Sequence, residues 1–223
     1  MDSIFSQPTD STEERWACVW DFVFQRLLPR TPRPATRNTA RDATPLPQSI
    51  RCFESFVDAL GEKKTSQLLG TPRHYTEFDY RWGVYVLFDD DCMNAWYGIP
   101  ASNNWDDDPE VVQYFYPSFD SIEPPESRAV GQELSGFILS KLVSKAGVKR
   151  SCAWRDGPTR KLIARIEREC IDRFEFGKRV SAFEFPQITA FLIPGLQYDD
   201  MAQSVLQALS WNAKSEIPSS LRF

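Results

Sequence analysis

The chain has 223 residues, 42% of them hydrophobic and 26% charged, and its formal net charge is −5 at pH 7. These values are typical of a globular protein whose own apolar core stabilises it without a disulfide framework or a structural metal. The net negative charge argues against a nucleic-acid-binding domain, which is expected to be basic. The five cysteines are an odd number without a Cys-x-x-Cys pair, so we expect neither a disulfide framework nor a zinc site.

No segment of the sequence resembles an export signal or a membrane span. The first residues, MDSIFSQPTDSTEE, contain neither a basic nor an apolar stretch, and no uncharged apolar run approaches the length of a membrane span. We therefore expect a cytoplasmic protein in a reducing compartment, with neither membrane nor nucleic acid among its partners.

The N-terminal segment, residues 1–28, predicts an amphipathic helix. Ser11 and Glu14 form a capping-box pattern, and apolar residues follow them at helical spacing as far as residue 28. Prolines and arginines dominate residues 29–45, which we expect to form a linker or a surface loop. A second helix is expected directly after this linker.

The remaining elements alternate between helices and clustered strands. Apolar spacing predicts helices at residues 48–60, 130–146, 159–174 and 199–209, with Gly61 as the stop of the first. Runs of aromatic and β-branched residues predict strands at residues 81–88, 95–99, 111–116, 174–185 and 188–193. Asp89 to Asp91 is expected to be a turn. This order indicates an α+β fold and argues against a doubly wound parallel sheet.

The middle of the chain is acidic and aromatic. Between Arg81 and Arg128 there is no lysine or arginine, yet this stretch holds ten acids: Asp89, Asp90, Asp91, Asp106, Asp107, Asp108, Glu110, Asp120, Glu123 and Glu126. Adjacent carboxylates repel one another and resist burial, so stability alone favours mixed charge on a surface. The stretch therefore predicts contact with a basic partner.

The sequence offers little support for catalysis or for a cofactor. His74 is the only histidine and has no nucleophile motif near it, and nucleotide-binding and zincin motifs are absent. The aspartate triplets lack the alternating spacing of a calcium loop, which favours a solvated or partner-facing loop over a metal site. We expect no catalytic residue, no cofactor and no metal.

One enzyme alternative rests on two short motifs. Gly83-Val84-Tyr85 and Trp96-Tyr97-Gly98 resemble the paired motif of GIY-YIG nucleases. That chemistry needs an arginine on the helix after the second motif, and no arginine occurs before Arg128. A degenerate nuclease remains the less favoured alternative.

Several short motifs occur in a fixed order between residues 46 and 146. They are Leu46-Pro47-Gln48-Ser49-Ile50-Arg51, Leu68-Leu69-Gly70-Thr71-Pro72, Asp89-Asp90-Asp91 followed by Trp96, Asp107-Asp108-Pro109-Glu110-Val111, and Glu133-Leu134-Ser135-Gly136-Phe137. In this order they resemble the SUKH superfamily, which includes the fungal SMI/KNR-like regulators and many bacterial immunity proteins. This sequence departs from the family motifs at two places. Three aspartates replace Glu-Asn-Gln, and Glu110 replaces a proline. Both changes make the same edge more acidic.

The resemblance implies a SUKH-like α+β domain, expected over residues 46–212 with a C-terminal tail at 213–223. Its fold would be a central curved, mixed or antiparallel sheet flanked by helices. It further implies a non-enzymatic immunity protein that neutralises a cognate toxin, and an acidic surface suits a basic nuclease toxin. A regulatory or scaffold module of the SMI/KNR-like type is the alternative.

The predicted partner-binding residues are the acids of the two triplets, their neighbour Glu110 and one exposed aromatic. They are Asp89, Asp90, Asp91, Trp105, Asp106, Asp107, Asp108 and Glu110. We expect Trp82 and Trp96 to lie in the core of the sheet, because each sits within an apolar strand pattern. Trp105, in a polar loop, is the better candidate for a desolvated anchor.

Overall fold

The computed structural model describes residues 10–28, 46–72, 78–79, 82–90, 95–102, 107–115, 124–146, 150–154, 158–177, 180–193, 204–210 and 216–222. The chain divides into two compact units, Thr31–Ile138 and the combination of Met1–Arg30 with Leu139–Phe223. The division falls within helix α4 (Leu134–Lys145). Each unit is described by itself.

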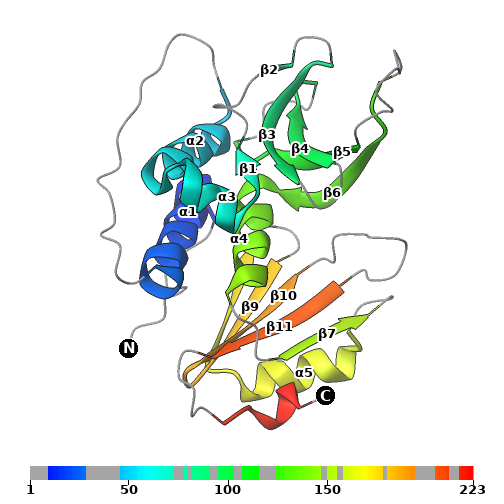
Figure 1. Ribbon diagram of the computed structural model, residues 1–223. Coiled ribbons are helices and arrows are strands. Elements are labelled where there is room, and N and C mark those ends of the chain that lie inside the picture. The colour runs from blue at the N-terminus through cyan, green and yellow to red at the C-terminus, as the bar shows by residue number, and fades with distance from the viewer. Residues whose placement is uncertain are drawn as a thin grey trace. The chain divides into compact units, whose positions relative to one another are not determined.

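The unit Thr31–Ile138 contains an antiparallel sheet and two helices besides the start of α4 (Figure 1). Its helices are α2 (Gln48–Leu60) and α3 (Glu62–Leu68). Its strands are β1 (Thr71–Pro72), β2 (Phe78–Asp79), β3 (Val84–Asp90), β4 (Ala95–Pro100), β5 (Glu110–Phe115) and β6 (Ser127–Glu133). The strand order is β1-β3-β4-β5-β6, and β2 also pairs with β3.

One face of this sheet packs on the helices through aromatic rings. The ring of Phe88 lies 6.3 Å from that of Phe53 in α2 and 6.0 Å from that of Phe137 in α4. Tyr97, opposite Phe88 in the register, lies 4.9 Å from Phe137. Because successive side chains on a strand alternate between faces, Trp96 lies on the other face. There it is buried beside Val84, Val86 and Tyr114.

The second unit contains a sheet with helices on both faces. Its helical elements are α1 (Thr12–Asp21), the π-helix η1 (Phe22–Leu27), α5 (Arg160–Glu169) and η2 (Ser219–Leu221). Its strands are β7 (Arg150–Trp154), β8 (Asp172–Phe176), β9 (Val180–Phe185), β10 (Ile188–Ile193) and β11 (Ser204–Ser210), in the order β7-β11-β10-β9-β8. Every pairing is antiparallel.

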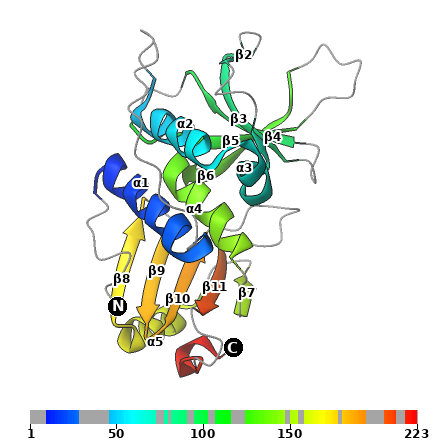
Figure 2. The same cartoon turned by 60° about the vertical axis from the view of Figure 1, so that its left-hand side comes forward.

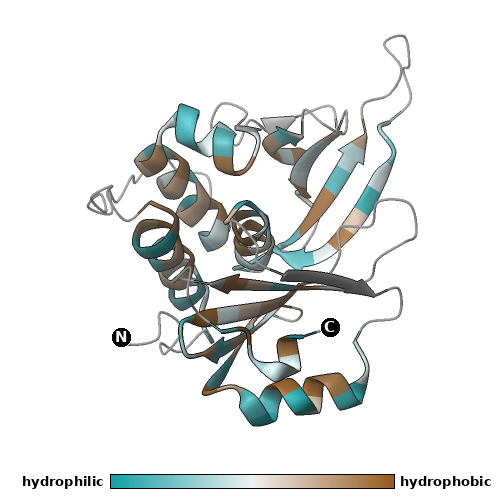
Figure 3. Cartoon of the chain, turned by 60° about the horizontal axis from the view of Figure 1, so that its bottom comes forward, coloured by the Kyte–Doolittle hydropathy of each residue, from teal (hydrophilic) through white to brown (hydrophobic). Residues whose placement is uncertain are grey.

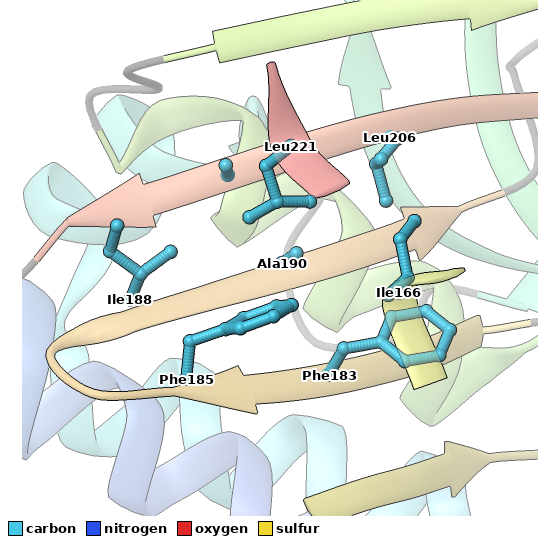
Figure 4. Close-up of a cluster of buried hydrophobic side chains, with 8 residues drawn as sticks. Ile166, Phe183, Phe185, Ile188, Ala190, Leu206 and Leu221 are labelled. Atoms are coloured by element: carbon cyan, nitrogen blue, oxygen red, sulfur yellow. The ribbon is translucent and has the colours of Figure 1, made fainter. Parts of the chain in front are cut away.

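Alternation along the strands supplies an apolar layer to each face of this sheet. On one face, Phe22 of η1 meets Phe191 of β10 edge to face at 5.7 Å, and α1 crosses the strands obliquely (Figure 2). On the other face, Ile166 of α5 and Leu221 of η2 pack against Phe183 and the neighbouring strands (Figure 4). Apolar and hydrophilic residues alternate along helix α5, as its colouring in Figure 3 shows.

Boundaries of three helices were predicted correctly. The capping box at Ser11 and Glu14 is formed, with both reciprocal bonds present. The second helix has the predicted bounds Gln48–Leu60, and Gly61 follows it with a φ of 77°. Residue Thr159 caps α5 by accepting a hydrogen bond from the Leu162 backbone N–H.

Parts of the other predicted helices are strands. The helix expected at 130–146 begins only at Leu134, because residues 127–133 form β6 against β5. The helix expected to reach residue 174 ends at Glu169, and β8 follows. Residues 204–210, expected in the last helix, form β11 between β10 and β7. In each case pairing with neighbouring strands outweighs local apolar spacing.

The predicted α+β class is confirmed, with antiparallel sheets. The units differ from the expected domain boundaries, because residues 139–212 belong with the N-terminal helix and not with residues 46–138. The expected tail also differs, since Leu221 is buried in the core beside α5. The expected linker at 29–45 lies outside the described residues. Within the described part of the chain, no helix is both long and apolar enough to cross a membrane.

Candidate acidic interaction site

The predicted acidic residues lie at opposite ends of one sheet. Asp90 pairs with Ala95 at the end of β3, whereas Glu110 begins β5 beside the far end of β4. Asp89 stands level with Trp96, and extending the Gly98–Val112 register by two residues places Glu110 level with Pro100. Four residues separate these levels, or about 13 Å along the strands. The two groups of predicted acids therefore do not form a single cluster.

Residues 107–110, here called the β5 entry, present two carboxylates to solvent. Asp107 and Glu110 are exposed, but Asp108 between them is only 8% exposed. Asp108 is therefore not available for the partner contact predicted for it. Asp106 and Trp105, which precede this segment, lie outside the described residues.

The carboxylate of Asp108 is bonded inside the fold. It accepts hydrogen bonds from the Ser49 hydroxyl at 2.6 Å, the Ser135 hydroxyl at 2.5 Å and the Ser135 backbone N–H at 3.1 Å. Ser49 and Ser135 are themselves fully buried. Hydrogen bonds of this kind offset the cost of burying a charge.

Backbone carbonyls on either side of Asp108 bind the same two helices. The Ser49 N–H of α2 donates to the Asp107 carbonyl at 2.8 Å, and the Leu134 N–H of α4 donates to the Pro109 carbonyl at 3.0 Å. The first N–H groups of a helix have no partner within the helix, and its N-terminus favours negative charge. The β5 entry thus caps the N-termini of α2 and α4 together.

A further pair of acids meets at the β5 entry. Glu110 lies directly opposite Glu133 of β6 in the strand register. The register shifts between Glu110 and Val112, so this pair lies beside a β-bulge. Glu133 was not predicted as a site residue, because sequence analysis placed it inside a helix. Glu133 of β6 therefore stands beside the β5 entry, which itself contains the exposed acids Asp107 and Glu110.

The end of β3 differs from the predicted turn. Asp89 and Asp90 are paired strand residues, opposite Trp96 and Ala95, and Asp89 is half-buried. Asp89 also pairs with Thr71 of β1. The Asp90 side chain and the whole of Asp91 lie outside what the structure describes.

Trp96 lies in the core of the sheet, as expected, whereas Trp82 lies in the turn before β3. Trp96 is 6% exposed and stacks on Tyr114, with ring centroids 4.2 Å apart. Trp82 is half-buried and packs against the same cluster. Burial raises the pKa of the Tyr114 hydroxyl to about 12.

The tyrosines of the GIY-YIG-like motifs are committed to the core. Tyr85 and Tyr97 are both buried, and the Tyr97 hydroxyl accepts a hydrogen bond from the Gln113 side-chain amide at 3.3 Å. These positions lend no support to a nuclease centre. Among the described residues, no group of three or more histidines, cysteines or acids is placed to hold a metal ion.

The chain was compared with protein families, curated proteins and solved structures. No family model, curated protein or solved structure matches it. The resemblance to the SUKH superfamily therefore remains a prediction from the short motifs alone.

Proposed function

We propose that this protein is a non-enzymatic binding protein that uses the β5 entry to contact a basic protein. The proposal extends to an immunity role of the SUKH type, acting in the cytoplasm on a cognate toxin such as a basic nuclease. The observation that supports the proposal is the exposure of Asp107 and Glu110 at the β5 entry. A basic partner would neutralise these exposed carboxylates.

The charge pattern around the β5 entry supports this proposal. No lysine or arginine occurs from residue 82 to residue 127, so strand β5 and the sequence on either side of it contain no cation. An acidic surface attracts a basic partner before contact and raises the rate of association. Nuclease toxins must approach phosphates, so an inhibitor with this surface competes for the same positive site.

Affinity capture with matched variants tests the proposal. The variant Asp107→Asn/Glu110→Gln removes two exposed carboxylates at the β5 entry. The variant Asp58→Asn/Glu62→Gln removes two exposed carboxylates at the other end of α2, and Asp58 lies about 13 Å along the helix from Ser49. Both variants change the net charge equally, so a difference in capture reports the position of the removed carboxylates and not the total charge.

We expect the wild type and Asp58→Asn/Glu62→Gln to retain one stoichiometric basic protein from the native host. We expect Asp107→Asn/Glu110→Gln to lose most of it. The captured protein is then identified by mass spectrometry, purified and tested for toxicity and for neutralisation by this chain. Capture of several signalling or cell-wall proteins would favour the scaffold alternative. Equal capture by all three forms would exclude the β5 entry as the contact.

A further inference from the structure

The segment Asp107-Asp108-Pro109 supplies acceptors to two helices that lie far apart in the sequence. Residue Pro47, the N-cap of α2, provides no side-chain hydrogen bond, and Ser49 instead donates to the segment from 59 positions away. Ser135 in α4 donates to the same carboxylate from 27 positions away. One buried carboxylate thus joins α2, α4 and the start of β5.

We propose that Asp108 is the positioning residue of the β5 entry, which it holds in a preformed conformation with Asp107 and Glu110 directed to solvent. This inference rests on the proposed function and concerns how the same site is organised. Neighbouring carboxylates repel one another, so in an unrestrained segment their side chains would move apart. A fixed segment loses little conformational entropy when the partner binds.

The three bonded amides give a direct readout of this conformation. The N–H groups of Ser49, Leu134 and Ser135 lie in the first turns of their helices, and the structure pairs all three with the segment 107–109. No bond within either helix replaces these acceptors. Their hydrogen exchange therefore reports the state of the β5 entry separately from the sheet.

The test measures amide exchange in the full chain for Asp108→Ala, Asp108→Asn and Ser135→Ala. We expect Asp108→Ala to speed exchange of the Ser49, Leu134 and Ser135 amides by about tenfold or more, beyond any change at β4. Asp108→Asn keeps one oxygen acceptor and should have a smaller effect. Ser135→Ala removes one hydroxyl donor and gives a milder form should Asp108→Ala fail to fold. Ser55→Ala, which removes a hydroxyl bonded within α2, is the matched control.

Association with the captured basic protein gives the second readout. We expect Asp108→Ala to slow association about as much as Asp107→Asn/Glu110→Gln does, although both exposed carboxylates are still present, and Asp108→Asn to recover part of the rate. Unchanged exchange of the three amides would overturn the proposal, as would faster exchange with an unchanged association rate. If the wild type captures no basic protein, the proposed function fails, while the exchange data still decide whether Asp108 holds the segment.

Discussion

Single residues determine the packing on the face of the β3-β4-β5 sheet that carries Trp96. There Trp96 lies over Gly98. A Cβ atom at position 98 would lie 2.6 Å from the Val84 Cγ1 atom and 2.8 Å from the Tyr85 carbonyl oxygen. It would also lie 3.0 Å from the Trp96 ring. Cores resist such insertion because they are already close-packed. Glycine at this position is therefore a requirement of packing.

We predict that Gly98→Ala destabilises the protein by about 1–3 kcal/mol, the usual cost of overpacking a core. Urea unfolding measures the change in the free energy of unfolding. The effect should be smaller in a Val84→Ala background, where the nearest side-chain atom is gone. Strictly additive costs in this double-mutant cycle would show that Val84 is not the neighbour that resists the new methyl group.

A second residue-scale prediction concerns pH. Burial, and then the nearby charges of Asp21 and Glu14, raise the pKa of the Cys18 thiol to about 12. In the unfolded chain the thiol ionises near its ordinary value of about 8.5. The raised pKa means that the stabilisation by the neutral thiol is complete below about pH 8.5 and is lost as the pH rises towards 12.

We therefore expect the wild type to lose stability relative to Cys18→Ala between pH 8 and about pH 10.5. Denaturant unfolding of both proteins across this range provides the measurement. A constant difference between the two proteins would mean that the thiol ionises alike in the folded and unfolded chains.

Elements show why sequence patterns succeed in some segments and fail in others. The bounds of α2 follow from local signals, the apolar spacing and Gly61, which act within a few residues. The strand β11 depends on β10 and β7 on either side of it, and no local pattern in residues 204–210 reports those neighbours. Apolar spacing that fits a helix then also fits a buried strand.

The candidate site shows the same limit. The base-free acidic stretch was visible in the sequence, and it supplied Asp107 and Glu110. The burial of Asp108 was not visible, because its partners Ser49 and Ser135 come from distant helices. One signal was present, since Pro47 cannot cap α2 with its own side chain. When a helix begins without a capping side chain, its first backbone N–H groups need an acceptor from another part of the chain.

The β5–β6 pair leads to a prediction at the scale of elements. Replacing Glu110 by Gln removes one of two opposed charges, so we expect the free energy of unfolding to rise by roughly 0.2–1 kcal/mol. The gain should shrink at high ionic strength, since salt screens exposed charges. Glu62→Gln on α3 is the matched control. A loss of stability in Glu110→Gln would indicate that Glu110 makes a favourable contact in the isolated protein.

At the scale of the whole molecule, a net charge of −5 hides an uneven distribution. The stretch from residue 82 to residue 127 contains acids without bases, and its described part places Asp107 and Glu110 at one strand end. The protein as a whole gains solubility from net negative charge, and any acid serves that purpose. The proposed recognition depends instead on where the acids lie.

The most direct test of this account is the association rate with the captured basic protein, measured by stopped flow at several salt concentrations. For the wild type and for Asp58→Asn/Glu62→Gln, we expect fast association that slows steeply as salt increases. For Asp107→Asn/Glu110→Gln, we expect association about tenfold slower at low salt, with a much flatter salt dependence. Equal rates and equal salt dependence in the two double variants would contradict the claim that the β5 entry is the contact.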